Sequence, residues 1–534
     1  MKLSHLFHWE KLVSWTLIVS FVIFTENLTL AQSLSQNYLP IGEPSSDREI
    51  DKIKIKSIRV IGNTVLVTEI AEFVNKLLGK ELDPEQVSKI SDDITKLYRK
   101  RGFITSGAVI SRTDLERGFI EIKVIEGRLE ALIISGLKRL REGYIRERIL
   151  DRVSSPLNFQ QLEESRILLE RDPLFDSVKF SLARGGISES TNLTVLVEEA
   201  QIIRPKFVIA NDQSPNIGEW QGRFGLSHLN LLGVGDKIEA EYGRNVEADT
   251  YKLSYFVPIN DRDGTWEFTL SRGFSSVVLP SLREIDLRIE SDIFRSRIRQ
   301  PIIKNVRREV AVAGEFYIGN SQNFVLDDIS VGEANFLALR LSQEWIENIP
   351  AMTALLLVQS ELSFGLAKSD NPLSEIDSDF ALLRVQSQFI KEMGDNNEFL
   401  TNIRLIGQYS PNFLLTIEKL SLGGVNIGRG YPKDTLFGDS AIFATLELRY
   451  RVFQDEDWGE IYIVGFTDVG AVWNQGDTGD SNAIASIGTG VTWEVQERVN
   501  LELFWGIPLI NIEQPTDSLS GNGIHTKIGL SYQF

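Results

Sequence analysis

Beyond residue 205 the chain alternates apolar and polar residues in segments about ten residues long. A period of two predicts β-strands, because successive side chains of a strand point to opposite faces. One such segment, 443–452, carries Ala444, Leu446, Leu448, Tyr450 and Val452 on one face and Thr445, Glu447, Arg449 and Arg451 on the other. The pattern restricts this region to an all-β fold, either a transmembrane barrel or a soluble sandwich.

Three features favour the barrel over the sandwich. Apart from Trp9 and Trp15, every tryptophan lies in the alternating region, several near strand ends, where membrane barrels carry aromatic girdles. The chain stops on Phe534 with Tyr532 two residues earlier, which resembles the last strand of outer-membrane proteins and predicts an assembly signal. The number of segments is also even. The tryptophans of the region are Trp220, Trp266, Trp345, Trp458, Trp473, Trp493 and Trp505.

The fold that we predict is mainly β, with a sixteen-stranded transmembrane β-barrel over residues 205–534. A bacterial barrel of this size encloses a water-filled lumen, and closure leaves no unpaired strand edge in the lipid. A long loop at 411–440 follows the eleventh strand. The strands are predicted near 206–212, 220–231, 236–246, 249–258, 264–273, 285–297, 307–319, 335–347, 351–367, 379–393, 397–410, 441–454, 460–473, 483–495, 498–507 and 524–534.

The first residues have the layout of a secretory signal. Lysines precede an apolar run at 12–24, and the small residue Ala31 offers a cleavage point. We expect a signal peptide at 1–31 and a flexible polar leader at 32–52, the alternative being an uncleaved membrane anchor. The chain contains no cysteine, which fits an oxidising compartment, where stray thiols would mispair.

Two small modules with the element order β-α-α-β-β lie before the barrel, at 53–127 and 128–200. In the first, Asp83 and Pro84 provide an N-cap and a first-turn proline for a helix. In the second, Asn158 is placed to cap a helix in the same way. Helical and strand periodicities together predict two α+β domains, each near the lower size limit for a self-sufficient core.

Composition and motifs argue against several classes of function. The formal net charge of −18 argues against nucleic acid as a partner. The four histidines are scattered, and without cysteine they predict no zinc site. No GxxxxGK, GxSxG or HExxH motif occurs. We therefore expect no catalytic site, no cofactor and no metal. The histidines are His5, His8, His228 and His525.

A glycine-rich stretch at 423–432 lies within the long loop. It contains Gly423 and Gly424, followed by Gly428, Arg429, Gly430 and Tyr431. Glycine on either side lets the Arg429 guanidinium approach a partner closely. By residue reach the loop is long enough to fold back into the lumen. The plainer interpretation is a surface turn.

A carboxylate near a glycine, Asp468, follows in the predicted strand 460–473. Strand parity turns Phe466, Asp468 and Gly470 toward the lumen, with Gly470 leaving space beside the carboxylate. Arg429 is then expected to pair with Asp468 through two hydrogen bonds, which an ammonium could not make. At about 4 Å and an effective dielectric of about 20, the attraction is about 4 kcal/mol before desolvation. Water in the lumen would lower this value, which predicts a releasable latch. The plainer interpretation of Asp468 is a hydrated wall residue.

Several of these stretches resemble known proteins. The two small modules resemble POTRA domains in their element order and in the stretches LYRKRGF at 97–103 and IKVIEG at 122–127. Residues 428–431 resemble the in-turned loop motif V/I-R-G-Y/F of POTRA-bearing outer-membrane transporters, with glycine replacing the β-branched residue. Residues 466–470 match the F-x-D-x-G strand motif of the same proteins. Over 53–534 the chain resembles the transporter subunit (TpsB type) of two-partner secretion systems, the hemolysin-activator or filamentous-hemagglutinin-secretion family.

This resemblance implies an outer-membrane pore that exports one large, β-rich partner exoprotein without nucleotide hydrolysis. Its POTRA domains would stand in the periplasm and bind the unfolded client by β-augmentation, in which main-chain hydrogen bonds supply the affinity. Barrel-assembly machinery would act on the terminal residues Tyr532 and Phe534, and outer-membrane lipid would surround the strands.

Two other functions fit parts of the sequence. A barrel insertase of the same superfamily would use the same loop and strand motifs but usually carries more POTRA units. A diffusion channel would need neither the modules nor the loop motif. A neighbouring reading frame for a large secreted repeat protein would distinguish secretion from insertion.

Overall fold

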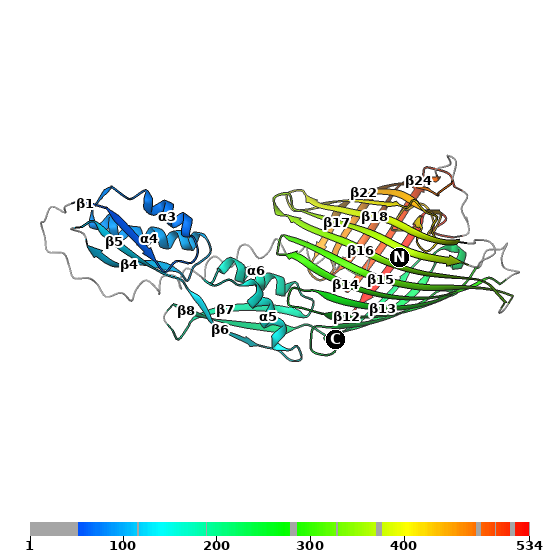
Figure 1. The fold of residues 1–534 in the computed structure, drawn as a ribbon. Coiled ribbons are helices and arrows are strands. Elements are labelled where there is room, and N and C mark those ends of the chain that lie inside the picture. The colour runs from blue at the N-terminus through cyan, green and yellow to red at the C-terminus, as the bar shows by residue number, and fades with distance from the viewer. Residues whose placement is uncertain are drawn as a thin grey trace. The chain divides into compact units, whose positions relative to one another are not determined.

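The structure is a computed structural model. It describes residues 52–114, 117–187, 189–277, 286–326, 329–369, 376–476, 482–496, 498–512 and 518–532. The predicted signal peptide, the leader up to residue 51 and Phe534 lie outside these ranges. Figure 1 shows the helices in the N-terminal part of the chain and the long strands in the C-terminal part. None of the described helices is long and apolar enough to cross a membrane.

The first α+β module is built on a sheet with the strand order β2-β5-β4. Its elements are β1 (Ile53–Lys54), β2 (Ser57–Ile61), α3 (Val67–Asn75), β3 (Glu81–Leu82), α4 (Pro84–Lys100), β4 (Gly107–Asp114) and β5 (Phe119–Ile125). Asp83 accepts a hydrogen bond from the amide of Gln86, and Pro84 opens α4. The predicted N-cap and first-turn proline of this helix are confirmed.

The second α+β module carries a sheet with the strand order β6-β8-β7. Its elements are β6 (Arg128–Ser135), α5 (Glu142–Arg152), α6 (Phe159–Glu170), β7 (Phe175–Arg184) and β8 (Ser190–Glu199). Asn158 accepts hydrogen bonds from the amides of Gln160 and Gln161, which confirms it as the N-cap of α6. The predicted order β-α-α-β-β occurs here, and the first module adds the short β1–β3 pair to it.

A carboxylate at the end of the last strand closes each module in the same way. Glu126 accepts hydrogen bonds from the amides of Thr64 and Val65, at 2.8 and 3.1 Å. Glu199 accepts hydrogen bonds from the backbone amides of 138–140. The sequence analysis missed this repeat, because the carboxylate lies 62 residues after its first partner in the first module and no local pattern links them.

Sixteen of the described strands after residue 202 form a closed barrel, in chain order, with β26 pairing back onto β9. The predicted fold class and strand number are therefore confirmed. Every neighbouring pair in the closed sheet is antiparallel. The strands are β9 (Ile203–Ala210), β10 (Gln221–Leu229), β11 (Lys237–Arg244), β12 (Ala248–Pro258), β13 (Thr265–Ser276), β14 (Arg288–Lys304), β15 (Arg308–Val325), β16 (Ile329–Ile349), β17 (Ala354–Ser369), β18 (Ile376–Met393), β19 (Phe399–Tyr409), β22 (Ser440–Asp455), β23 (Gly459–Trp473), β24 (Asn482–Val495), β25 (Val499–Pro508) and β26 (Ile524–Ser531).

Several strands extend beyond their predicted ends. The strand predicted at 285–297 is β14, which starts at Arg288 and continues to Lys304. It passes Pro301 through an irregularity in its pairing with β15, and a bulge is one of the few places where a strand accepts proline. The proline and the nearby charged residues hid this extension in the sequence, because both weaken apolar alternation.

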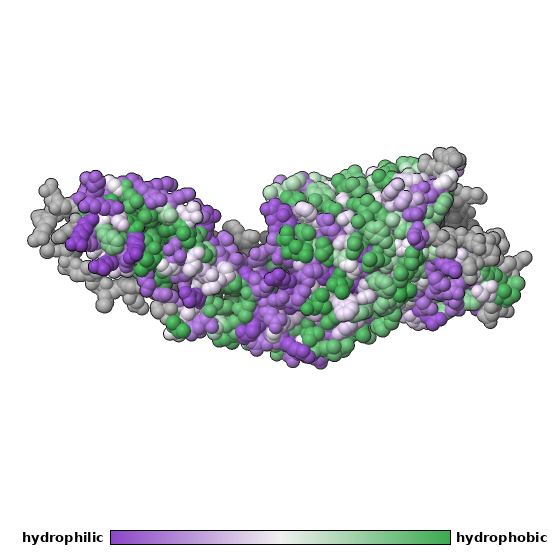
Figure 2. All heavy atoms as spheres, in the orientation of Figure 1, coloured by the Kyte–Doolittle hydropathy of each residue, from purple (hydrophilic) through white to green (hydrophobic). Residues whose placement is uncertain are grey.

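The barrel wall turns one face of each strand outward, with mostly apolar side chains, and the other inward, with polar and some apolar ones. Along β23, Ile463 and Val469 are about half exposed, whereas Phe466 and Asp468 are buried. Figure 2 shows hydrophobic residues concentrated over the barrel strands. Trp266, Trp345, Trp458 and Trp493 lie beside the short turns of the barrel, and Trp220, Trp473 and Trp505 lie toward its opposite end. This distribution matches two aromatic girdles at the membrane surfaces.

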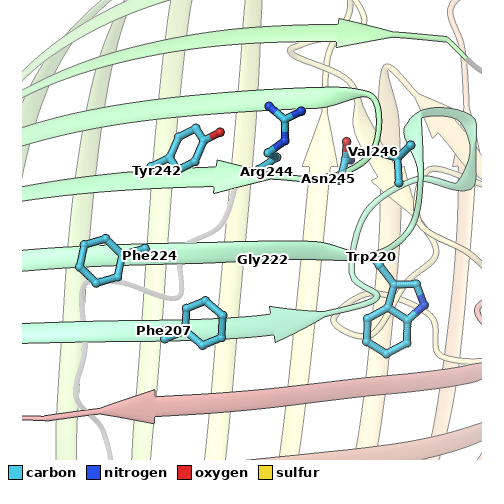
Figure 3. Close-up of a pocket in the computed structure, with 8 residues that line it drawn as sticks. All are labelled: Phe207, Trp220, Gly222, Phe224, Tyr242, Arg244, Asn245 and Val246. Atoms are coloured by element: carbon cyan, nitrogen blue, oxygen red, sulfur yellow. The ribbon is translucent and has the colours of Figure 1, made fainter.

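The outer wall has a shallow depression over β9, β10 and β11 (Figure 3). It is lined by Phe207, Trp220, Gly222, Phe224, Tyr242, Arg244, Asn245 and Val246. Phe207, Phe224 and Tyr242 face one another across the strands in register. Because this aromatic row lies on the lipid-facing side, we assign it to the membrane surface rather than to the functional site.

Candidate functional site

The long loop between β19 and β22 is folded back into the lumen. It contains a short hairpin, in which β20 (Leu420–Leu422) pairs with β21 (Leu436–Gly438). The loop residues Leu420, Leu422, Ile427, Tyr431 and Leu436 belong to one apolar cluster with the inward-facing wall residues Ile406, Ala441, Phe443, Val472 and Ile484. Packing against the inner face of β19, β22, β23 and β24 therefore holds the hairpin inside the barrel.

Arg429 and Asp468 contact each other directly. The Nε and Nη2 atoms of Arg429 donate to the two carboxylate oxygens of Asp468, at 3.0 and 2.9 Å. The backbone amide of Arg429 donates to the same carboxylate at 2.8 Å. The planar fork of a guanidinium matches the two oxygens of a carboxylate. The structure thus brings the two residues together in the bidentate geometry.

The neighbouring strand β22 contributes a second acid to this cluster. Arg429 Nη1 donates to Glu447, and Nη2 donates to the Thr445 hydroxyl at 2.9 Å. Thr445 lies directly opposite Asp468 in the strand register, and its hydroxyl donates to that carboxylate. Each polar group of the guanidinium therefore has an acceptor on the barrel wall.

Two aromatic rings enclose the guanidinium. The Cζ atom of Arg429 lies 3.6 Å from the centre of the Phe466 ring and 5.3 Å from that of Phe504. The two rings themselves meet edge to face, with centres 6.1 Å apart. A cation over an aromatic face is attracted by the negative charge of the ring face. Phe466 of the strand motif therefore stacks its ring against the Arg429 guanidinium.

The cluster is buried. Arg429 is 4 % exposed, Asp468 1 % and Glu447 5 %. The expectation of a pair weakened by lumenal water is therefore wrong, because the hairpin and the two phenylalanines exclude solvent from it. Removing one partner of such a pair leaves an uncompensated buried charge and costs about 3–5 kcal/mol. The contact is therefore a buried, fully hydrogen-bonded anchor, and losing either partner would leave a desolvated charge behind.

The backbone of the loop motif requires its glycines. Gly428 has a φ of +115°, and a Cβ atom there would lie 2.3 Å from Cδ1 of Ile484. Gly430 has a φ of +99°, and its Cβ atom would press on Ser486. L-residues with side chains rarely adopt such angles. The absence of the usual β-branched residue at position 428 thus follows from this loop conformation.

The residues on either side of Arg429 fix the hairpin to the wall. Gly423, with a φ of +115°, passes so close to Pro432 that a Cβ atom would lie 2.1 Å from its carbonyl oxygen. The backbone amide of Gly424 donates to the carbonyl oxygen of Tyr431 at 2.8 Å. The Tyr431 hydroxyl is fully buried and lies 2.9 Å from the carbonyl oxygen of Ala485. These contacts hold Arg429 in position.

Gly470 makes room for the loop rather than for water. A Cβ atom at this position would lie 2.9 Å from Cδ1 of Leu422 and 3.1 Å from Phe443. The three residues of the strand motif therefore have separate roles. Phe466 stacks under the guanidinium, Asp468 binds it, and Gly470 receives the hairpin.

The sequence analysis missed part of the cluster. It placed Thr445 and Glu447 on the polar face of their strand without linking them to Arg429. It did not single out Phe504, nor Gly506, where a Cβ atom would lie 2.5 Å from the amide nitrogen of Gly430. Strand parity already pointed these side chains inward, but only the register of the closed barrel shows which of them meet the loop.

The predicted assembly residues lie apart from this cluster. Tyr532 is about half exposed, and its amide donates to the carbonyl oxygen of Pro205 at 3.0 Å. It therefore extends the pairing of β26 with β9 at the point where the barrel closes. Phe534 lies outside the described residues. Within the described ranges, no group of three or more potential metal ligands occurs.

A closed barrel with an in-turned loop, preceded by α+β modules, defines the class of pore-forming outer-membrane proteins. A family model described as haemolysin secretion/activation protein ShlB/FhaC/HecB matches residues 189–493. A second model, the ShlB-type POTRA domain, matches residues 53–127. The chain therefore belongs to the ShlB/FhaC/HecB family.

Relatives support this assignment over most of the chain. The outer membrane transporter CdiB of Dickeya dadantii (strain 3937) is 21 % identical, over 78 % of this chain and 75 % of that protein. The hemolysin transporter protein ShlB of Serratia marcescens is 23 % identical, over 91 % of this chain and 88 % of that protein. Among solved structures, CdiB from Escherichia coli matches with a TM-score of 0.71 and 19 % identity, covering 95 % of this chain and 96 % of that chain.

Proposed function

We propose that the Arg429 cluster controls a protein-conducting pore, and that the client is one large, β-rich exoprotein recognised in the periplasm. The coarser function follows from the family. The chain is an outer-membrane transporter that secretes a partner protein, with its POTRA domains on the periplasmic side. The insertase and the diffusion channel are not favoured, because the family and the named relatives are secretion transporters.

The loop is proposed to close the pore at rest and to move during transport. Its support is the single observation that a buried arginine ties the loop to two acids on adjacent wall strands. Because these two acids lie on the wall and their partner lies on the in-turned loop, their contact can hold the loop against the wall. The proposed assignments of Gly428, Gly430 and Tyr431 follow from the same contacts.

Client recognition is proposed to use a free sheet edge of the POTRA modules. In the first module the edge strand β4 pairs irregularly with β5 between Ile110 and Arg112, and such bulges oppose the addition of a strand. In the second module β7 is an edge strand of ten residues. A long edge offers more main-chain hydrogen bonds to an extended client. We therefore place the first contact with the unfolded client on β7.

The domain limits and the assembly step belong to the same proposal. We assign 53–127 and 128–200 to the two POTRA domains and 205–534 to the barrel, with a cleaved signal peptide at 1–31. Barrel-assembly machinery is proposed to act on the strand that ends with Tyr532 and Phe534.

The central test is secretion by the Arg429→Ala variant, co-expressed in a Gram-negative host with the partner exoprotein. Secretion into the medium should be almost lost, while heat-modifiable migration on gels shows that the barrel still assembles. The matched control is Arg451→Ala, because this arginine lies on the wall strand β22 and pairs with Glu460 of the wall instead of linking the loop to it. Normal secretion by Arg429→Ala would contradict the proposal.

Contact with β7 is tested by cross-linking. Because the chain has no cysteine, a single cysteine at Ser181 of β7 can carry a photo-reactive group without background. We expect it to cross-link to the client during secretion. A cysteine at Lys89, on the exposed side of α4, is the control. Equal cross-linking at both positions would rule out β7 as the preferred edge.

A further inference from the structure

A second buried ion pair joins the loop to a different part of the wall. Nη2 of Arg340, on β16, donates to the carboxylate of Glu418 at 2.6 Å. The two side chains are 5 % and 2 % exposed. Glu418 lies at the start of the loop, before the hairpin. Its partner strand is far along the barrel from β22 and β23, which hold Arg429.

The backbone at Glu418 is held as firmly as its side chain. Its carbonyl oxygen accepts a hydrogen bond from Nε2 of Gln408 at 3.0 Å and another from Nη2 of Arg384 at 3.5 Å. Arg384 in turn donates to the side chain of Gln408. Three neighbouring regions of the wall therefore converge on one loop residue.

An apolar contact accompanies this ion pair. The loop residues Leu414 and Leu415 are buried in one cluster with the wall residues Tyr317, Phe336, Ala338, Ala367, Phe380 and Leu382. These wall residues belong to β15, β16, β17 and β18, whereas the cluster around the hairpin uses β19, β22, β23 and β24. The loop therefore rests on the wall at two separate places, each with its own apolar cluster and its own ion pair.

Arg340 has a second acidic neighbour besides Glu418, and this acid is shared with Arg295 and Arg297. Glu315, on the adjacent strand β15, lies 3.4 Å from Arg340, and the Arg340 guanidinium also covers the ring of Tyr317 at 4.1 Å. A wall that needed only stability would gain little from a further buried acid, because desolvating a charge offsets most of its attraction. A buried ion pair does specify one geometry, which suits a positioning contact.

We propose that Glu418 and Arg340 form a second anchor that positions the in-turned loop, so that the loop leaves the lumen only when both ion pairs break. The two anchors have opposite polarity. At the first, a loop cation binds wall acids; at the second, a loop acid binds a wall cation. This inference rests on the proposed role of the loop and adds a residue pair to it.

Loop release can be measured on the purified full-length protein in liposomes, without any client. A single cysteine at Leu420 serves as the reporter, because this side chain is 9 % exposed and lies between the two anchors. A thiol-reactive maleimide should label it only when the loop departs. The variants are Glu418→Gln, Arg429→Gln and the two combined. Single-channel conductance in planar bilayers provides a second readout.

We expect Glu418→Gln to speed labelling by about tenfold, both alone and in the Arg429→Gln background, because anchors that must both break contribute independently. The frequency of open-channel events in planar bilayers should rise in each variant in which labelling becomes faster. The matched control is Glu344→Gln. Glu344 is also buried, at 7 % exposed against 2 % for Glu418, and it pairs with Arg297 and Arg299 on the wall strand β14, so its variant should label at the native rate.

Two outcomes would overturn the second anchor. Glu418→Gln could leave the labelling rate unchanged, both alone relative to the native protein and in the double variant relative to Arg429→Gln. Alternatively, Glu344→Gln could speed labelling as much as Glu418→Gln does. The proposed function fails separately, if Arg429→Gln leaves both labelling and secretion unchanged. The two inferences are therefore tested by different variants.

Discussion

The first POTRA module and the barrel lumen are packed by opposite rules. The module has an apolar core, in which Ile70, Ile94, Ile120 and Ile122 are almost completely buried. The lumen buries arginines and carboxylates beside the two apolar clusters that the loop covers, while many leucines and most tryptophans of the barrel strands face outward. The difference follows from the solvent outside. Water surrounds the module, whereas lipid surrounds the barrel and takes up the apolar side chains.

This comparison shows where each region is vulnerable. An apolar core loses stability in proportion to the area and volume removed from it. A buried charge network depends on complete pairing, because one missing partner leaves a desolvated charge. Substitutions of similar size should therefore act gradually in the module and abruptly at the loop.

The largest effect is expected from Asp468→Ala. Arg429 would keep Glu447 but lose the bidentate partner of its fork, and the loop contact should weaken by about 3–5 kcal/mol. Hydrogen exchange of the hairpin amides, measured on the full-length protein, should rise accordingly. Unchanged protection of the hairpin would show that apolar packing alone holds the loop, and the comparison would fail.

A core substitution in the POTRA module should cost slightly less and leave the loop unaffected. Ile94→Ala removes a fully buried side chain from α4 and should lower the free energy of unfolding of the module by about 2–5 kcal/mol. Hydrogen exchange of the β5 amides measures this loss. Altered exchange in the hairpin of the same variant would contradict the independence of the two regions.

Backbone strain should have an intermediate effect. Gly428→Ala forces a side chain into a φ of +115° and against Ile484, at a cost of about 1–3 kcal/mol. The matched control is Gly465→Ala on β23, where a Cβ atom would meet nothing within 4 Å. Secretion and hairpin exchange should change only in the first variant. Equal behaviour of the two alanine variants would remove the steric explanation for glycine at position 428.

The smallest effect is expected from the carboxylate that closes the first module. Burial alone would raise the pKa of Glu126, but hydrogen bonds from Thr64, Val65 and Tyr98 outweigh it and hold the pKa below the ordinary value of 4.5. Its contribution to stability is therefore complete above pH 4.5 and is lost as the pH falls through the lowered pKa.

Glu126→Gln should lower the free energy of unfolding of the module at pH 7 by about 1 kcal/mol. The variant should also lose the part of the pH dependence of unfolding that comes from titration of Glu126. Unfolding of the native protein and the variant, followed by hydrogen exchange from pH 7 down to a pH below the lowered pKa of Glu126, measures the difference. A pH dependence that is identical in both proteins would show that Glu126 does not carry it.

The sequence alone determined the architecture. Alternation with a period of two specifies which face of each strand meets lipid, so the outward position of Ile463 and the inward position of Asp468 followed without coordinates. The helix caps at Asp83 and Asn158 were equally readable, because capping depends on residues three or fewer positions apart. The pairing of Arg429 with Asp468 was predicted from parity and a motif resemblance.

Only the tertiary structure decided what surrounds that pair. The partners Glu447 and Phe504, and the second contact between Glu418 and Arg340, depend on the register and closure of sixteen strands. No local pattern encodes such contacts, since each joins residues from different strands or from the loop. The burial of the Arg429 cluster could not be predicted from the sequence either. It arises because the loop and the wall together cover charges that each segment alone would expose to water.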